Sequence, residues 1–181
     1  TPLFLCGLSG AAGIAAALLA AGADATRATA KASTPLMAAV FHGHPDLVEL
    51  LLAAPGIDAA HVNLANDEGH SALAAAAQNG SGRLFARLEA AGARVPPPGT
   101  GRAFSFLHCA AMGGHPAIVA AALAAGHPVD RPDPAGWTAL HVAAQLDRGG
   151  AAALLLDCGA DPDRPQAGGW TPLLLAAHWD A

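Results

Sequence analysis

The triplet Thr34-Pro35-Leu36 opens the stretch that decides the fold of this 181-residue chain, because its pattern returns along the whole length. Related triplets with Thr or Ser first and Leu third begin at residues 1, 34, 71, 105, 138 and 171. The separations between these starts are 33, 37, 34, 33 and 33 residues. A period of this size predicts a stack of small supersecondary units rather than one globular core.

Each unit has the pattern of two short helices separated by glycine. Thr or Ser can cap the first helix, and Pro is tolerated in its first turn. Apolar residues at helical spacing, such as Leu47, Val48 and Leu51, mark the second helix. Glycines stand where a left-handed residue would end each helix, at positions 10, 43, 80 and 114 for the first and 22, 56, 92, 126 and 159 for the second. The sequence therefore predicts an all-α protein.

These motifs resemble the ankyrin repeat family. Residues 107–110 and 140–143 read Leu-His-x-Ala, residues 43–48 and 114–119 form a Gly-His turn with the start of an apolar helix, and Gly159-Ala160-Asp161 ends a repeat. The resemblance covers residues 1–181 and implies a single ankyrin-like solenoid of about five and a half repeats. It further implies paired antiparallel helices with short hairpin or loop fingers, and hydrogen-bonding structural roles for the histidines at 108 and 141.

Three places depart from the regular period. One extra residue within 53–55 and three more within 57–70 lengthen the second repeat and its finger. The prolines at 96–98 remove N–H donors and favour an extended path over a regular hairpin. In the fifth repeat Asp147 replaces the turn glycine, and Gly149-Gly150 lowers helix propensity by about 1 kcal/mol per residue. We expect a frayed second helix there.

Charge and composition limit the partners that the chain would take. The net charge is -5, and no run of Lys or Arg forms a footprint for nucleic acid or an anionic membrane surface. The apolar stretches are too short to cross a bilayer, so we expect no membrane insertion. The cysteine count of three is odd, and each cysteine falls in a predicted helix. We therefore expect the thiols to be free and mostly buried, as in a protein of a reducing compartment. This expectation predicts an intracellular, cytoplasmic location.

Nine histidines invite a metal or catalytic interpretation, which the spacing does not favour. A zinc site needs about four ligands, and neither Cys-x-x-Cys nor His-Glu-x-x-His occurs. His108 and Cys109 are adjacent in a predicted helix and do not face each other. We therefore expect no catalytic residue, no metal site, no cofactor and no small-molecule substrate, and we expect that the chain is not an enzyme.

The scarce aromatic residues gather at two positions of the repeat. Aromatics make up 4% of the chain, yet all three tryptophans stand either directly before the Thr/Ser motif or directly before the turn. Trp and Met are enriched in interface cores. The predicted partner-binding surface comprises Phe41, His42, His70, Phe104, Met112, Trp137, Leu146, Trp170 and Trp179. The alternative is that the Trp rings only cover neighbouring fingers.

These features favour a non-enzymatic module that binds a partner protein on its concave or finger face. One alternative is an inhibitor or immunity-type partner of an enzyme, which the acidic charge favours. A second alternative is the recognition domain of a larger multidomain enzyme, channel or ligase adaptor. That alternative fits the expectation that both ends of the sequence are truncated, because each interrupts a repeat.

Overall fold

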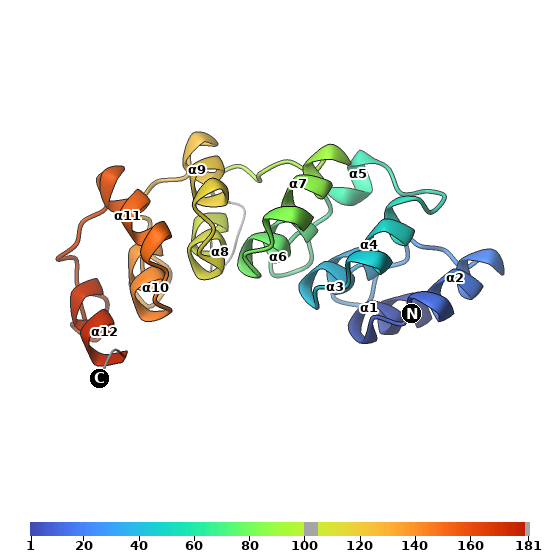
Figure 1. Ribbon diagram of the computed structural model, residues 1–181, viewed down its shortest axis with the longest axis horizontal. Coiled ribbons are helices and arrows are strands. Elements are labelled where there is room, and N and C mark those ends of the chain that lie inside the picture. Colours follow the sequence, from blue (N-terminus) through green and yellow to red (C-terminus); the bar gives the residue numbers. More distant parts are fainter. Residues whose placement is uncertain (100–104, 180–181) are drawn as a thin grey trace. The chain divides into compact units, whose positions relative to one another are not determined.

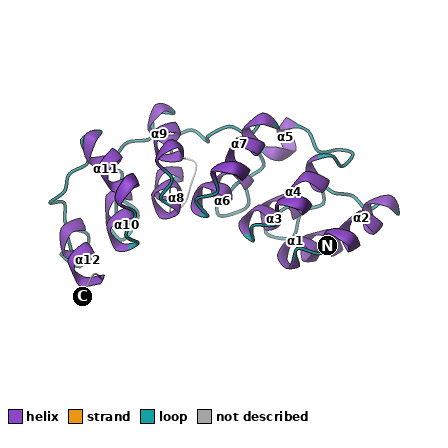
Figure 2. Cartoon of the chain, in the orientation of Figure 1, coloured by secondary structure: helices purple, strands orange, loops and turns teal. Residues whose placement is uncertain are grey.

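The regular structure of the chain is helical (Figures 1 and 2). The computed structural model describes residues 1–99 and 105–179. These residues contain no β-strand, only one isolated antiparallel bridge between Ala65 and Ser71. The helices are α1 (Pro2–Ser9), α2 (Ala12–Ala20), α3 (Pro35–Phe41), α4 (Pro45–Leu52), α5 (Ala59–Val62), α6 (Ala72–Gln78), α7 (Gly82–Ala90), α8 (Phe106–Gly113), α9 (Pro116–Ala124), α10 (Ala139–Gln145), α11 (Gly149–Asp157) and α12 (Pro172–Trp179). The predicted all-α fold class is confirmed.

Contacts group the residues into two compact units. Unit 1 comprises Thr1–Ala76 and Arg83–Arg94, and unit 2 comprises Ala77–Gly82 and Val95–Ala181. Each unit repeats the same element pair, in which a first helix begins at the Thr/Ser motif and a second helix returns beside it after a tight turn (Figure 2). The assignment of residues 1–181 to one domain stays a prediction.

The Thr/Ser motif builds the start of each first helix through its hydroxyl group. The Thr34 hydroxyl accepts a hydrogen bond from the Met37 N–H at 3.2 Å, and the Ser71 hydroxyl accepts one from the Ala74 N–H at 3.2 Å. Such a cap satisfies one of the N–H groups that an α-helix leaves without an internal partner. The recurrence of this local chemistry explains why the sequence alone located the first helices.

In the helix that starts at Gly149, packing outweighs the low helix propensity of glycine. Asp147 adopts the left-handed conformation with φ 52°, as the turn glycines do in other repeats. The helix then runs without interruption from Gly149 to Asp157, so the expectation of a frayed start is wrong. Gly150 lies so close to Pro116 that an added Cβ would come within 3.2 Å of the ring. The second glycine therefore permits a close helix approach, and contacts with α9 and α10 outweigh its low propensity.

Small residues let neighbouring repeats approach closely in each unit. First helices pack against first helices, as in the pairs α1 with α3, α8 with α10 and α10 with α12. Second helices pack likewise, in the pairs α2 with α4 and α9 with α11. Ala39 in unit 1 and Ala110 and Ala143 in unit 2 are fully buried on first helices, and Leu47 and Ile118 are buried on second helices. Stability therefore depends on contacts between adjacent repeats.

The extra residues of the second finger form a docked turn of helix, α5. Asn63, at its end, donates to the carbonyl oxygens of Ala59 at 2.7 Å and Gly92 at 2.8 Å. Its side-chain oxygen accepts from the Arg94 N–H at 2.8 Å. Hydrogen bonds thus hold the insertion against the residues that follow α7, within unit 1.

The finger with three prolines has no regular hairpin over its described residues, 95–99. Instead, the Pro96 carbonyl accepts a hydrogen bond from Nε2 of His127 at 2.8 Å. In the described parts of the chain, no helix has both the length and the apolar character needed to cross a membrane.

Two glycine substitutions test the close packing in unit 2. A Cβ at Gly113 would overlap the Ala77 carbonyl oxygen and crowd Gly80, whereas a Cβ at Gly13 in α2 would meet open space. We expect Gly113→Ala to lower the free energy of unfolding by about 1 to 3 kcal/mol, as overpacking does. Gly13→Ala should raise it by about 0.5 to 1 kcal/mol through helix propensity. Urea denaturation followed by circular dichroism measures both, and equal effects would contradict the close approach.

Candidate functional site

Trp137 is the last residue of a tight turn that forms one finger of unit 2. The Asp133 carboxylate accepts hydrogen bonds from the N–H groups of Ala135 and Trp137, both at 2.8 Å. The Asp133 N–H donates to the Trp137 carbonyl oxygen at 2.8 Å. One aspartate therefore closes the turn from both its side chain and its backbone.

Trp170 ends the equivalent turn of the next finger. The Gln166 N–H donates to the Trp170 carbonyl oxygen at 3.0 Å, and the Gln166 side-chain oxygen accepts from the Gly168 N–H. The two fingers are joined by a hydrogen bond from the Ala167 N–H to the Ala135 carbonyl oxygen at 3.0 Å. Trp137 and Trp170 thus occupy the same position on two adjoining fingers of unit 2.

A buried histidine connects each of these fingers to the preceding first helix. Nε2 of His108, on α8, lies 2.9 Å from the Trp137 carbonyl oxygen. Nε2 of His141, on α10, lies 3.2 Å from the Trp170 carbonyl oxygen. The predicted hydrogen-bonding structural role of both histidines is confirmed.

The partners of the other ring nitrogen fix the tautomer of His108. Nδ1 accepts from the Ser105 N–H at 3.3 Å and faces the Ser105 hydroxyl at 2.8 Å, completing a capping box. A backbone N–H can only donate, so Nδ1 carries no proton and Nε2 carries the proton given to the Trp137 carbonyl. His141 makes the same contacts to Thr138, at 3.2 and 2.8 Å.

Burial keeps both rings neutral. Desolvation lowers the pKa of His108 and of His141 below the ordinary value, against the opposing effect of the hydrogen bond to the finger carbonyl. A second proton on either ring would sit at Nδ1 and displace the N–H donor of the cap. The rings therefore act as fixed structural donors.

The two Trp rings rest against their own repeats and leave part of their surface to solvent. The Trp137 ring is half-buried, with its centroid 5.9 Å from that of His141. Trp170 is 39% exposed, and its ring meets His178 edge to face at 5.2 Å between centroids. Coverage of the repeat and contact with a partner are both compatible with this placement.

The other predicted site residues divide between the units. In unit 1, Phe41 and His42 are exposed at the end of α3 with their rings 5.2 Å apart, and His70 ends the finger of residues 66–70. In unit 2, Met112 is half-buried near the end of α8, and Leu146 is exposed at the end of α10.

Two members of the predicted surface cannot be located in this way. Phe104 lies outside the described residues, and so does the side chain of Trp179. The partner-binding set as a whole stays a prediction.

Sequence reasoning missed Gln166 and Asn66, which shape two of the fingers. Each stands three residues before a glycine with positive φ, as Asp133 does, and this spacing was a usable signal. It also missed His127, which occupies the position of the alanine in the Gly-Ala-Asp ending. His127 is buried, and burial lowers its pKa. Across residues 1–99 and 105–179, no group of three or more His, Cys, Asp or Glu side chains could hold a metal ion.

The buried histidines predict a pH-dependent stability. Because the pKa of His108 and of His141 is lower in the folded protein, the unfolded chain takes up protons first as the pH falls below about 6.5. The free energy of unfolding should therefore fall between about pH 7.5 and about pH 5.5. The double variant His108→Gln/His141→Gln keeps a capping-box side chain that does not titrate, so its pH dependence should be flatter. Urea denaturation at each pH measures this effect.

A double variant with the same slope as the unsubstituted protein would contradict the assigned roles of the two buried rings.

Comparison with known proteins agrees with this repeat architecture. A family model described as ankyrin repeats, three copies, matches residues 3–97 and 98–166. The human ASB11 ankyrin repeat domain is similar at 28% identity and a TM-score of 0.73, over 98% of this chain and 77% of that chain. No curated protein sequence matches the chain.

A second similar chain comes from the structure of the predatory endopeptidase Bd0816 of Bdellovibrio bacteriovorus in complex with the immunity protein Bd3460. Its identity is 25% and its TM-score 0.71, over 98% of this chain and 91% of that chain. The family model extends over most of the sequence and agrees with the helix pairs, caps and fingers described above. The chain belongs to the ankyrin repeat family.

Proposed function

We propose that this chain is a non-enzymatic module that binds a partner protein through the finger surface of unit 2, centred on Trp137 and Trp170. Ankyrin repeats are generally protein–protein interaction modules. The observation that carries the proposal is the pair of partly exposed Trp rings on fingers that are held by hydrogen bonds from buried histidines.

The rigidity of these fingers supports binding by a preformed surface. Each finger carbonyl at Trp137 and Trp170 accepts two hydrogen bonds, one from its own turn and one from a buried histidine. A surface fixed before binding loses little conformational entropy on association. Large aromatic rings with some solvent exposure frequently supply the dominant binding contacts.

The proposed surface extends beyond the two tryptophans. We include in it Met112 and Leu146, apolar residues at the ends of α8 and α10, and Phe104 and Trp179 by their positions in the repeat. The Phe41–His42 ring pair, with His70, is proposed as a second contact in unit 1. The partner would present apolar side chains, because Trp and Met offer it mainly apolar area.

An inhibitor or immunity-type partner of an enzyme is the second candidate function. Two observations favour it: a similar structure contains an endopeptidase in complex with an immunity protein, and the chain carries a net charge of -5. A net negative charge would favour association with a basic enzyme. Inhibition of a captured enzyme by the purified chain would separate this candidate from a scaffold.

A cytoplasmic location remains part of the proposal. All three cysteines are free, and two of them, Cys6 and Cys109, are buried while Cys158 is exposed. Burial raises the pKa of the Cys109 thiol to about 11, so that thiol is unreactive at neutral pH. Free thiols of this kind are typical of proteins kept in a reducing compartment.

The double variant Trp137→Ala/Trp170→Ala tests the proposal. If both rings are binding hot spots, it should weaken association with the partner by about 2 kcal/mol or more. Affinity capture from native lysate with quantitative mass spectrometry identifies candidates, and calorimetry with the purified candidate gives the affinity. Ile14→Ala, an exposed apolar residue of α2 in unit 1, is the matched control and should keep full binding.

Folding of each variant is followed by circular dichroism and thermal unfolding. A double variant that binds as well as the control variant would contradict the proposal. A double variant that loses its fold without a separable binding defect would favour rings that only cover their repeats.

A further inference from the structure

Unit 2 contains a run of three prolines, Pro96, Pro97 and Pro98, that the proposed Trp surface does not use. The described residues of this finger, 95–99, form neither helix nor strand. A proline ring fixes its own φ at about −65°, and a residue that precedes proline is restricted to the extended region. Val95, Pro96 and Pro97 each precede a proline. Stereochemistry therefore favours the polyproline II conformation for these three residues.

A buried histidine holds the start of the proline run against the core of unit 2. Nε2 of His127 lies 2.8 Å from the Pro96 carbonyl oxygen. His127 is 4% exposed, and the centroid of its ring lies 5.9 Å from that of the buried Phe106 ring. Because a carbonyl oxygen can only accept, Nε2 carries the donated proton. The run is thus fixed at Pro96 before any partner binds.

The next two prolines, Pro97 and Pro98, are both exposed. The chain then turns at Gly99, whose φ of 99° suits glycine. A polyproline II helix rises about 3.1 Å per residue, so the exposed pair presents an apolar ridge of about 6 Å. The pattern PxxP needs prolines three positions apart, and Pro96 and Pro98 are only two apart. The ridge therefore has the length for one slot between two aromatic rings.

We propose that the exposed pair Pro97-Pro98 binds the aromatic slot of a partner domain that recognises polyproline II segments, of the WW type. Aromatic-lined grooves select such segments because the preformed helix loses little conformational entropy on binding. The hydrogen bond from His127 adds to this preorganisation. This contact is a second one, beyond the proposed Trp surface of the same unit.

A titration of ¹⁵N-labelled WW domains with the complete, unlabelled chain tests the proposal. The probes are purified domains that together cover proline-rich ligands of different sequence. At least one domain should show saturable chemical-shift changes at the indole N–H of its slot tryptophan. Replacement of that tryptophan by Phe in the same domain should weaken binding. If no domain binds the chain saturably, the prolines only stiffen the finger and the proposal is overturned.

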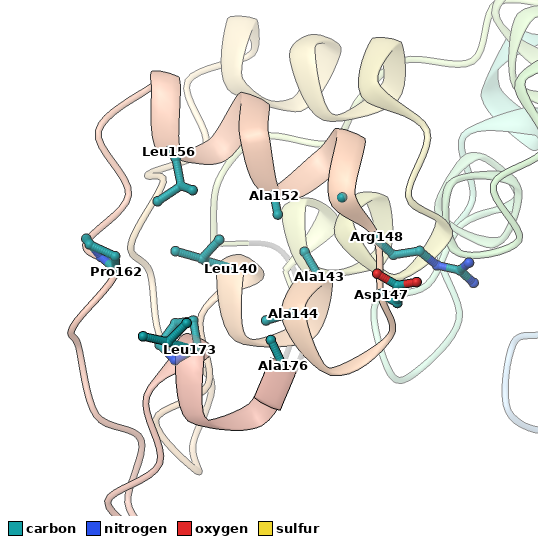
Figure 3. A pocket seen from close by; sticks show the side chains of 12 residues that line it. Leu140, Ala143, Ala144, Asp147, Arg148, Ala152, Leu156, Pro162, Leu173 and Ala176 are labelled. Atoms are coloured by element: carbon teal, nitrogen blue, oxygen red, sulfur yellow. The ribbon is translucent and has the colours of Figure 1, made fainter. Parts of the chain in front are cut away.

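Two variants of the chain give a matched comparison. Pro97→Ala/Pro98→Ala should weaken binding of the domain by at least about tenfold, because both rings leave the slot. The control is Pro162→Ala, at an exposed, isolated proline of unit 2 that borders an apolar groove between α10, α11 and α12 (Figure 3). It should change binding less than about twofold. Circular dichroism checks that both variants fold, and equal losses of binding would overturn the proposal.

Two further measurements locate the bound domain. An excess of decaproline peptide should displace the chain, because both occupy the same aromatic slot, and binding that persists would overturn the proposal. Trp137→Ala/Trp170→Ala should bind the domain as the unsubstituted chain does, because Pro97-Pro98 is separate from the two tryptophans. Loss of binding in that variant would place the domain on the Trp surface instead, which leaves the proposed function intact and refutes the proline contact.

Discussion

One imidazole in each of two repeats joins a helix to the finger of the next repeat. The Nε2–H groups of His108 and His141 reach the carbonyl oxygens of Trp137 and Trp170. The opposite nitrogen of the same ring completes the cap of the helix that carries it. The two interactions coexist only in a neutral ring of a single tautomer, and burial favours that state. Finger position, helix start and protonation state therefore depend on one another.

The two units differ in how their fingers are anchored. At the histidine position, the first three repeats carry Phe4, Met37 and Ala74. In unit 1, the Asn66 side chain closes the finger of residues 66–70. A hydrogen bond from the Asp67 N–H to the Lys31 carbonyl oxygen, at 3.2 Å, joins this finger to the preceding one. In unit 2 the finger backbone has the additional anchor from a buried ring. The backbone that carries the two tryptophans is thus held by its turn, by the adjoining finger and by the preceding helix.

The sequence predicted those parts of the structure that depend on local chemistry. A hydroxyl cap, a proline in the first turn and a left-handed residue after the helix act within a few residues, so the period of 33 located the helices directly. The length of the second finger was also visible, but its helix α5 was not. That helix depends on Asn63 meeting Gly92 and Arg94, about thirty residues away.

The errors and omissions have the same cause. Helix propensity alone predicted a frayed helix at Gly149, but the helix is complete because it packs on α9 and α10. The hydrogen bond between His127 and the Pro96 carbonyl oxygen joins two repeats, so a single repeat does not reveal it. For the candidate site, the pattern located Trp137 and Trp170 on fingers, whereas their contacts with His141 and His178 required the structure.

The tautomer of the two buried histidines, measured by ¹⁵N NMR of the imidazole nitrogens at neutral pH, tests this helix-to-finger link most directly. We expect neutral rings for His108 and His141, with the proton on Nε2 and with Nδ1 unprotonated. A proton on Nδ1, or a doubly protonated ring, would contradict the link, because neither state can accept the cap N–H while donating to the finger carbonyl.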